Sequence, residues 1–297
     1  MYKELAIIAP TASGKTALSI DLAHKLNAII LSLDSLAVYK KIDIASAKPT
    51  LEERDGIIHF GIDCIFPSET FDVIEFYEEY KKAKQFAINN GKNLIIVGGT
   101  GFYLKSLIDG LSKTPVISKS TNEIVKNELK DLNTLYEKLL KLDYDYMKKI
   151  ASNDKYRIEK ASQIYFETKL TPTEYFLQNK PKPIIDNLAI YEIQTDPDIL
   201  RDRIKKRTKI MLSDGLIDEV ISLESEYTRA PNCMNSIGIS ETFDYLDSKI
   251  SRIELENLIS VHTAQLAKRQ RTFNKSQFSN VKKSELKDMK NLILSHY

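Results

Sequence analysis

The sequence predicts an α/β fold, in which helices cover both faces of a parallel sheet and an all-helical insertion interrupts the chain. In the first third of the 297 residues, short wholly apolar runs such as Leu5-Ala6-Ile7-Ile8 alternate with segments of helical periodicity. Runs of this kind are typical of parallel strands buried on both faces. From about Lys113 to Pro183 no such run occurs, and apolar residues recur at helical spacing instead.

In the first third, strands and helices are expected in alternation. Asp72 is a suitable N-cap for a helix that reaches Asn90, and Gly91 is suited to end it. The run that follows stops at Gly98-Gly99-Thr100-Gly101. The expected strands are 5–9, 28–33, 59–63 (short and weak) and 93–97, and the expected helices are 14–26 and 73–90.

The rest of the chain predicts one more strand and several helices. Pro181-Lys182-Pro183 ends the helical insertion with a stiff, extended connector. A strand is expected over 188–193, and Asp196-Pro197 begins a long basic helix that ends near Gly215. Further helices are expected from Leu216 and from about 252 to 272. These patterns predict a core of residues 1–112 and 184–297 and a helical insertion of residues 113–183.

The loop after the first strand has the pattern of a phosphate-binding P-loop. It reads Ala9-Pro10-Thr11-Ala12-Ser13-Gly14-Lys15-Thr16 and leads into an amphipathic helix. In such a loop, backbone N–H groups and the helix dipole attract the anion, the lysine reaches its outer oxygens, and the threonine hydroxyl can bind Mg²⁺. Ala9 replaces the usual first glycine and must therefore keep a negative φ. The sequence thus predicts a P-loop NTPase-like core that binds a phosphorylated ligand.

Two further strand ends bear chemically useful residues. Asp34 follows the strand at 28–33 and should project over the same crevice as the P-loop, because ligands bind beyond the carboxyl ends of parallel strands. It could accept a proton, hold a metal through water, or simply form a turn. Gly98 and Gly99 allow a close backbone approach, either by substrate or within a structural turn, and Thr100 offers a hydroxyl.

The overall composition places the chain in the cytoplasm by default. The only cysteines, Cys64 and Cys233, have no disulfide or zinc spacing, and no segment resembles a signal peptide or a membrane span. The net charge is +2, but basic residues gather around Arg203 to Lys209 and Lys268 to Lys275. Each basic cluster could bind a polyanion or be a solvated helix face.

Four distinctive stretches are spread from residue 9 to residue 270. They are 9–16 (APTASGKT), 34–49 (DSLAVYKKIDIASAKP), 97–104 (VGGTGFYL) and 265–270 (QLAKRQ). Together they resemble the bacterial tRNA dimethylallyltransferases, also called tRNA isopentenyltransferases. The chain departs from the family pattern at Ala9, Ala45-Ser46, Lys160, Ala264, Phe273 and 237–241.

The resemblance implies transfer of the dimethylallyl group from dimethylallyl diphosphate to the exocyclic N6 amine of the adenosine 3′-adjacent to the tRNA anticodon. Asp34 would be the general base and Thr100 would orient the adenosine. Lys15, Thr16 and the loop backbone would hold the diphosphate with Mg²⁺, and Arg207 would contact the diphosphate. The residues implied to contact tRNA are Asp34, Ser35, Leu36, Ala37, Thr100, Tyr156, Arg157 and Lys160.

The chemistry of the residues agrees with this reaction. An adenine amine is a poor nucleophile, and an ionised aspartate can remove its proton as the C–N bond forms. Lysine, Mg²⁺ and the loop amides would stabilise charge on the departing diphosphate, so no protein nucleophile is expected. Flipping a base out of a single-stranded loop costs little, which suits an anticodon stem-loop, and Lys268 and Arg269 would contact its phosphates.

Two other functions fit parts of the sequence. The P-loop and Asp34 also fit an ATP-dependent small-molecule kinase, although the strand at 93–97 ends in glycine rather than in a metal-binding aspartate. The basic helices fit a nucleotide-gated RNA-binding protein without catalysis. For the transferase we expect a cytoplasmic monomer with no membrane association, Mg²⁺ as cofactor, and tRNA and dimethylallyl diphosphate as partners.

Overall fold

The computed structural model describes residues 2–297, and the chain forms two compact units. The first unit comprises Met1–Ile108 and Ile185–Tyr297, and the second comprises Asp109–Ile184. No helix within residues 2–297 is both long and apolar enough to span a membrane.

The first unit is built on a six-stranded sheet in the order β3-β2-β4-β1-β5-β6. All five pairings between neighbouring strands are parallel. The strands β1, β2 and β4 are buried almost throughout, which explains their continuous apolar sequences. The strands are β1 (Glu4–Ile8), β2 (Ala28–Leu33), β3 (His59–Phe60), β4 (Asn93–Gly98), β5 (Ala189–Gln194) and β6 (Val281–Glu285).

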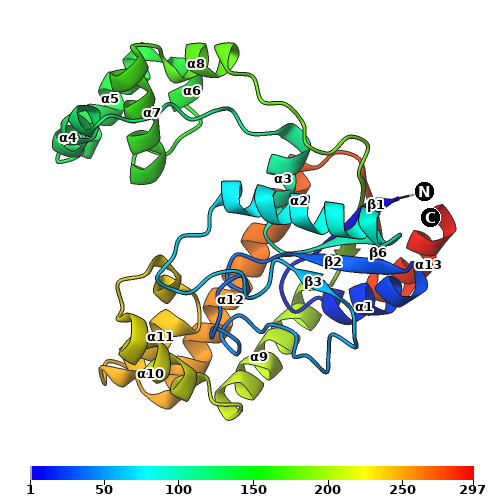
Figure 1. The fold of residues 1–297 in the computed structure, drawn as a ribbon. Coiled ribbons are helices and arrows are strands. Elements are labelled where there is room, and N and C mark those ends of the chain that lie inside the picture. The colour runs from blue at the N-terminus through cyan, green and yellow to red at the C-terminus, as the bar shows by residue number, and fades with distance from the viewer. Residues whose placement is uncertain (1) are drawn as a thin grey trace. The chain divides into compact units, whose positions relative to one another are not determined.

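Helices cover both faces of this sheet (Figure 1). On one face, α1 (Lys15–Lys25) and α13 (Leu286–His296) pack against alternate residues of the central strands. On the other face lies α2 (Val73–Asn89), which is followed after β4 by α3 (Gly101–Asp109). Phe76 of α2 and Tyr103 of α3 stack with their ring centroids 4.5 Å apart.

A second core lies beside the sheet in the same unit. It is formed by helices α9–α12 and by buried residues of the loop between β2 and β3, among them Val38 and Ile42. Figure 1 shows the long helices α9 and α12 beneath the sheet. The elements are α9 (Pro197–Ser213), α10 (Leu216–Tyr227), the 3₁₀ turn η1 (Asn232–Asn235), α11 (Ile239–Leu246) and α12 (Arg252–Gln277).

The second unit consists of five helices. Each begins at a side chain that accepts a hydrogen bond from the first turn, as at Ser118, Asp131 and Thr171. Its core contains Leu135, Leu139, Met147 and Ile158. The helices are α4 (Lys119–Glu128), α5 (Leu132–Leu142), α6 (Tyr144–Met147), α7 (Lys155–Thr168) and α8 (Pro172–Gln178).

Most expected elements are confirmed to within a residue or two, but one expected strand is shorter, the helix expected to end near 272 runs to Gln277, and three elements were missed. Asp72 caps α2, as expected, and the structure adds a capping box between Asp72 and Glu75. The strand at 59–63 ends at Phe60, because Gly61 turns the chain with a φ of +74° and its missing Cβ leaves room for the Ser32 carbonyl. The sequence analysis also missed β6 with α13, and the short helix α11.

Candidate active site

The carboxyl ends of β1, β2 and β4 meet at one edge of the sheet. The P-loop follows β1, Asp34 follows β2, and Gly99 and Thr100 follow β4. The Ala9 amide donates to the Gly98 carbonyl at 3.3 Å, and the Thr100 amide donates to the Leu33 carbonyl at 3.0 Å. The three segments are therefore held side by side by backbone hydrogen bonds.

The P-loop takes the conformation that its sequence requires. Gly14 is the N-cap of α1 with a φ of +91°, and Leu286 of α13 lies where a Cβ on this glycine would be. Ala9 is fully buried and is not among the residues with positive φ, so the expected ordinary backbone at this departure from the P-loop pattern is confirmed. Ala12, at a φ of +62°, makes the left-handed turn of the loop.

Side chains from two distant helices hold the P-loop in place. From α9, the Arg203 Nη1 donates to the Ser13 carbonyl and the Arg207 Nη1 donates to the Thr11 Oγ1, each at 3.1 Å. From α12, the Gln270 Oε1 accepts a hydrogen bond from the Thr11 amide at 3.0 Å. The P-loop is thus fixed by residues that lie 190 to 259 positions further along the chain.

Two cations stand close together at this loop. The Lys15 Nζ donates to the Pro10 carbonyl at 3.3 Å, and no salt bridge joins Lys15 or Arg207 to a carboxylate within residues 2–297. Burial, and secondarily the charge of Arg207, lowers the pKa of Lys15 to about 8, while Asp34 acts in the opposite direction. Burial also lowers the pKa of Arg207. Unneutralised cations of this kind favour binding of an anion.

Asp34 combines a structural role with a place in the site. Its Oδ1 accepts hydrogen bonds from the amides of Leu36 at 2.8 Å and Ala37 at 3.1 Å. The side chain is therefore a turn former, one of the alternatives that the sequence left open. Asp34 also lines the two cavities at the P-loop.

These residues surround two adjoining cavities. One is about 70 Å³ in volume and the other about 300 Å³, and both are lined by Thr11, Lys15, Asp34 and Arg207. Polar groups and the loop between β2 and β3 dominate the smaller cavity, whose other lining residues include Thr16, Ser19, Ser32, Ala37, Ser46, Lys48 and His59. The larger cavity adds Ser35, Leu36, Thr100, Met211, Asn235, Ser236, Ile237, Ile259, Leu266 and Gln270.

The other expected phosphate-binding residues form the backbone of the P-loop without lining these cavities. Ala9, Pro10, Ala12, Ser13 and Gly14 shape the loop and do not line either cavity.

Lys268 and Arg269 lie on α12 and line neither cavity. Lys268 instead lines a separate groove of about 500 Å³ between α9 and α12, and Arg269 is exposed. The groove has an apolar floor and a basic rim, which includes Arg201, Lys205 and Arg271.

Tyr156, Arg157 and Lys160 begin helix α7 of the second unit, and all three are exposed. The Tyr156 ring has the Lys160 Nζ at 5.7 Å from its centroid. The Arg157 Nη1 forms an ion pair with the N-cap Asp154 at 2.7 Å.

The two glycines after β4 have structural reasons to be glycine. A Cβ on Gly98 would overlap the backbone of Leu33, and one on Gly99 would overlap the side-chain amide of Gln270. Protein atoms therefore make the close approach at both positions. A structural turn is therefore present at both positions, and Gly98 and Gly99 also line the smaller and the larger cavity, respectively.

Several residues at the site were not identified as such from the sequence. Gln270, Arg203 and Lys48 contact the P-loop or line the cavities, and Glu219 accepts hydrogen bonds from the β2–β3 loop. Lys48 and Gln270 lie within two of the four stretches that carried the resemblance. Their place in these stretches was the only sign of a role at the site, because a lone lysine or glutamine does not indicate which group it will contact.

The fold and the site define a class: an α/β protein in which a loop with the P-loop pattern, two cations and a carboxylate line one pair of cavities. A family model described as IPP transferase matches residues 37–277. The chain is 57% identical to a tRNA dimethylallyltransferase of Aliarcobacter butzleri over 99% of both chains. It is 56% identical to one of Sulfurovum sp., covering 98% of this chain and 97% of that one.

Solved structures agree with these sequence matches. A tRNA isopentenylpyrophosphate transferase from Bacillus halodurans superposes with a TM-score of 0.72 at 30% identity, covering 99% of this chain and 96% of that one. A eukaryotic dimethylallyltransferase acting on tRNA superposes with a TM-score of 0.82 at 26% identity, covering 99% and 77%. The chain therefore belongs to the IPP transferase family, and the expected fold and enzyme class, that of the tRNA dimethylallyltransferases, are confirmed.

Proposed function

We propose that the chain transfers the dimethylallyl group of dimethylallyl diphosphate to the N6 amine of the adenosine 3′-adjacent to the anticodon, giving N6-isopentenyladenosine. The observation on which this rests is that Lys15 and Arg207 share one pair of cavities with Asp34, and that Thr100 lines the larger one. An anion binder and a proton acceptor that line the same cavities suit displacement of a diphosphate by an amine.

The diphosphate is proposed to bind at the P-loop. Lys15 and Arg207 would neutralise charge on the leaving group. The absence of a salt bridge from either side chain to a carboxylate within residues 2–297 supports this, as does the lowered pKa of each. The Thr11 amide is already bonded to Gln270, so the anion would be bound by other amides of the loop and the first turn of α1.

Mg²⁺ is proposed as the cofactor. Within residues 2–297 no group of three or more His, Cys, Asp or Glu side chains could hold a metal ion alone. Mg²⁺ is commonly held by one or two protein oxygens together with substrate phosphates, and Thr16 and Asp34 line the smaller cavity. These donors fit such a shared site, in which the ion would supply charge neutralisation for the leaving diphosphate.

Asp34 is proposed as the general base. Because its Oδ1 already accepts two backbone hydrogen bonds, the proton would be received by Oδ2. Thr100, which lines the same larger cavity, is proposed to orient the amine. The allylic carbon bears cationic character as the diphosphate leaves, so positioning replaces covalent catalysis.

The proposed RNA contacts fall into two groups. Ser35, Leu36 and Ala37 lie beside Asp34 at the cavity. The others, on exposed helical surfaces, are Tyr156, Arg157, Lys160, Lys268 and Arg269. An exposed tyrosine and unburied cations are suited to base stacking and phosphate neutralisation. A cytoplasmic monomer remains our expectation for the acting form.

The test combines the protein with dimethylallyl diphosphate, Mg²⁺ and an anticodon stem-loop that has adenosine 3′ of the anticodon. Mass analysis of the digested RNA should find isopentenyladenosine, and a matched stem-loop with guanosine at that position should remain unmodified. If ATP phosphorylates a small alcohol while no prenylated RNA forms, the chain is a kinase instead. Tight RNA binding without any turnover would favour the non-catalytic alternative.

The role of Asp34 is tested by Asp34→Asn, which keeps an oxygen for the turn and removes the base. We expect the single-turnover rate to fall by about 10²- to 10⁴-fold, with tRNA affinity little changed. Asp72→Asn makes the same chemical change at the helix cap of α2, outside the cavities, and should leave the rate unchanged. An Asp34→Asn enzyme with the normal rate would refute the proposed base.

A further inference from the structure

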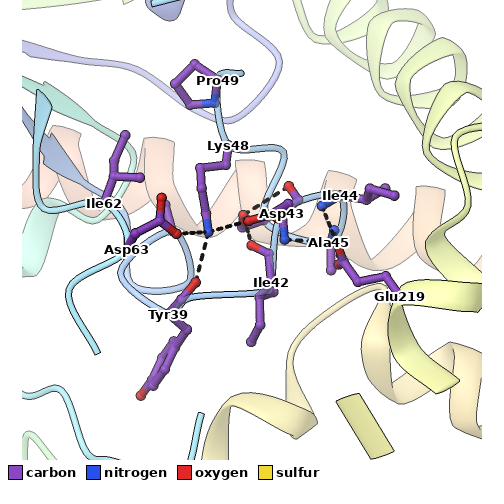
Figure 2. Close-up of polar contacts among 12 residues, drawn as sticks. Tyr39, Ile42, Asp43, Ile44, Ala45, Lys48, Pro49, Ile62, Asp63 and Glu219 are labelled. Atoms are coloured by element: carbon purple, nitrogen blue, oxygen red, sulfur yellow. Dashed lines mark hydrogen bonds and ion pairs between the residues drawn. The ribbon is translucent and has the colours of Figure 1, made fainter. Parts of the chain in front are cut away.

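Lys48 is a buried cation at the centre of the β2–β3 loop, and Figure 2 shows the groups that surround it. Its side chain is only 3% exposed. The Nζ donates to the Tyr39 carbonyl at 2.9 Å, to the Asp43 Oδ1 at 2.7 Å and to the Asp63 Oδ1 at 2.6 Å. All three donor positions of the ammonium are thus used by protein oxygens.

The three acceptors connect two segments of the chain. Tyr39 and Asp43 precede Lys48 in the loop, whereas Asp63 follows β3. The second oxygen of Asp63 pairs with the Arg54 Nη2 at 3.5 Å, and the Arg54 Nε donates to the Pro49 carbonyl at 3.0 Å. The carboxylates of Asp43 and Asp63 therefore balance the charges of Lys48 and Arg54. The loop is held to these groups both before and after Lys48.

A second clamp holds the same loop from α10. The Glu219 carboxylate accepts hydrogen bonds from three consecutive amides, those of Asp43, Ile44 and Ala45, at 2.9, 2.7 and 2.9 Å. Figure 2 shows Glu219 reaching this turn from the opposite side to Asp63. The turn at 43–45 is thus fixed between α10 and the ammonium of Lys48.

This clamped loop forms a wall of the site. Ser46 lines both cavities, and Lys48 and Pro49 line the smaller one together with Asp34. At its beginning, the loop is tied to the segment of Asp63, because the Asp63 amide donates to the Ala37 carbonyl at 3.1 Å. The Ala37 amide in turn bonds to Asp34 at 3.1 Å. A continuous set of hydrogen bonds therefore links Lys48, through Asp63 and Ala37, to Asp34.

We propose that Lys48 is a positioning residue for the transfer reaction: its ammonium holds the loop of residues 34–49 in the shape that presents Asp34 to the cavity of Lys15 and Arg207. Lys48 does not contact Asp34 and acts through the loop. The inference rests on the proposed function, since it assigns Lys48 a part in placing the proposed base. A shift of about 1 Å at a reacting group can lower a rate by about 100-fold.

The test uses Lys48→Met, which keeps the length of the side chain and removes the charge. We expect the single-turnover rate at saturating substrates to fall by about 10- to 100-fold, with little change in tRNA affinity and with the variant still folded at the assay temperature. Lys41→Met is the matched control: this lysine lies in the same loop, is 50% exposed and forms an ion pair with Glu226. A normal rate in folded Lys48→Met overturns the inference.

Combining the variant with Asp34→Asn separates a positioning role from an independent one. If Lys48 acts through Asp34, Lys48→Met should cost far less in the Asp34→Asn background than in the wild-type background. Equal losses in both backgrounds overturn the inference. A fully active Asp34→Asn enzyme instead refutes the proposed base, whatever Lys48→Met does, so the two failures are distinguishable.

Asp63→Ala provides a second variant if Lys48→Met does not fold. It leaves Lys48 with the Tyr39 carbonyl and Asp43, and it removes the tie between the ammonium and the segment after β3 together with the ion pair between Asp63 and Arg54. We expect a smaller fall in the rate with tRNA affinity retained. A folded Asp63→Ala enzyme with the normal rate likewise overturns the inference.

Discussion

Replacing the P-loop lysine by methionine should stabilise the free protein while it abolishes donor binding. The pKa of Lys15 falls from 10.5 to about 8, a difference of 10.5 − 8 = 2.5. Since one pKa unit corresponds to about 1.4 kcal/mol, holding this side chain charged costs the folded state at most about 3 to 4 kcal/mol. Loss of the hydrogen bond to the Pro10 carbonyl offsets about 1 kcal/mol. The net gain for Lys15→Met is therefore about 2 kcal/mol at neutral pH.

The pH dependence gives this prediction its sign. The folded-state pKa of Lys15 lies below the unfolded value, so the cost is fully present below pH 8 and disappears as pH rises from about 8 to 10.5. Urea unfolding should show Lys15→Met more stable than wild type at pH 7, with the difference shrinking over that range. Lys81→Met, at a side chain that is 60% exposed, should change stability by less than about 0.5 kcal/mol.

Adding inorganic pyrophosphate should reverse the order, because a ligand that binds only the folded state stabilises wild type alone. The reasoning is refuted if Lys15→Met is less stable than wild type at pH 7, or if the difference between them is the same at pH 7 and pH 10. It is also refuted if pyrophosphate stabilises both proteins equally.

Three further predictions follow from the packing and charges of the first unit. Gly98→Ala should lower the free energy of unfolding by about 1–3 kcal/mol, since the new Cβ would meet the backbone of Leu33. Gly99→Ala should lower it by less, because only the side chain of Gln270 must move. Equal losses in urea unfolding would contradict this. Glu219→Ala, which leaves three amides without their acceptor, should cost about 2 kcal/mol or more by the same measurement, and a cost below that of a surface substitution would count against the clamp. Lys268→Ala should weaken binding of the anticodon stem-loop and reduce the slope of log K against log salt by about 1, whereas an unchanged slope would remove Lys268 from the RNA contacts.

The central strands and most helices could be predicted because each depends on local sequence. A strand buried on both faces must be apolar throughout, as β2 and β4 are. A helix start depends on a few adjacent residues, so the N-cap at Asp72 was predicted from the sequence.

The edge strand β6 could not be predicted in this way. Its sequence is Val-Lys-Lys-Ser-Glu, with side chains that are mostly exposed. What makes it a strand is its parallel pairing with β5, from Ile190 opposite Val281 to Gln194 opposite Glu285. Backbone pairing does not require apolar side chains in an exposed edge strand. The local sequence pattern therefore did not indicate a strand there.

The candidate site divides in the same way. The P-loop and Asp34 were predictable, since both stand at strand ends and strand ends meet at one edge of a parallel sheet. Gln270 on the Thr11 amide, Arg203 on the Ser13 carbonyl and Glu219 on the β2–β3 loop were not. Each joins positions far apart in the chain, and neither residue of such a pair identifies the other.

By itself, the sequence determined that this chain has a parallel sheet, a loop with the P-loop pattern and a carboxylate that follows a neighbouring strand, because hydrophobic periodicity and the residues that follow a strand are local properties. Tertiary structure alone decided how that carboxylate is held, which helices fix the loop, and that Lys48 is buried among three oxygens. The reason is that burial and hydrogen-bond partners are set by which distant segments pack together, and packing is a property of the whole fold.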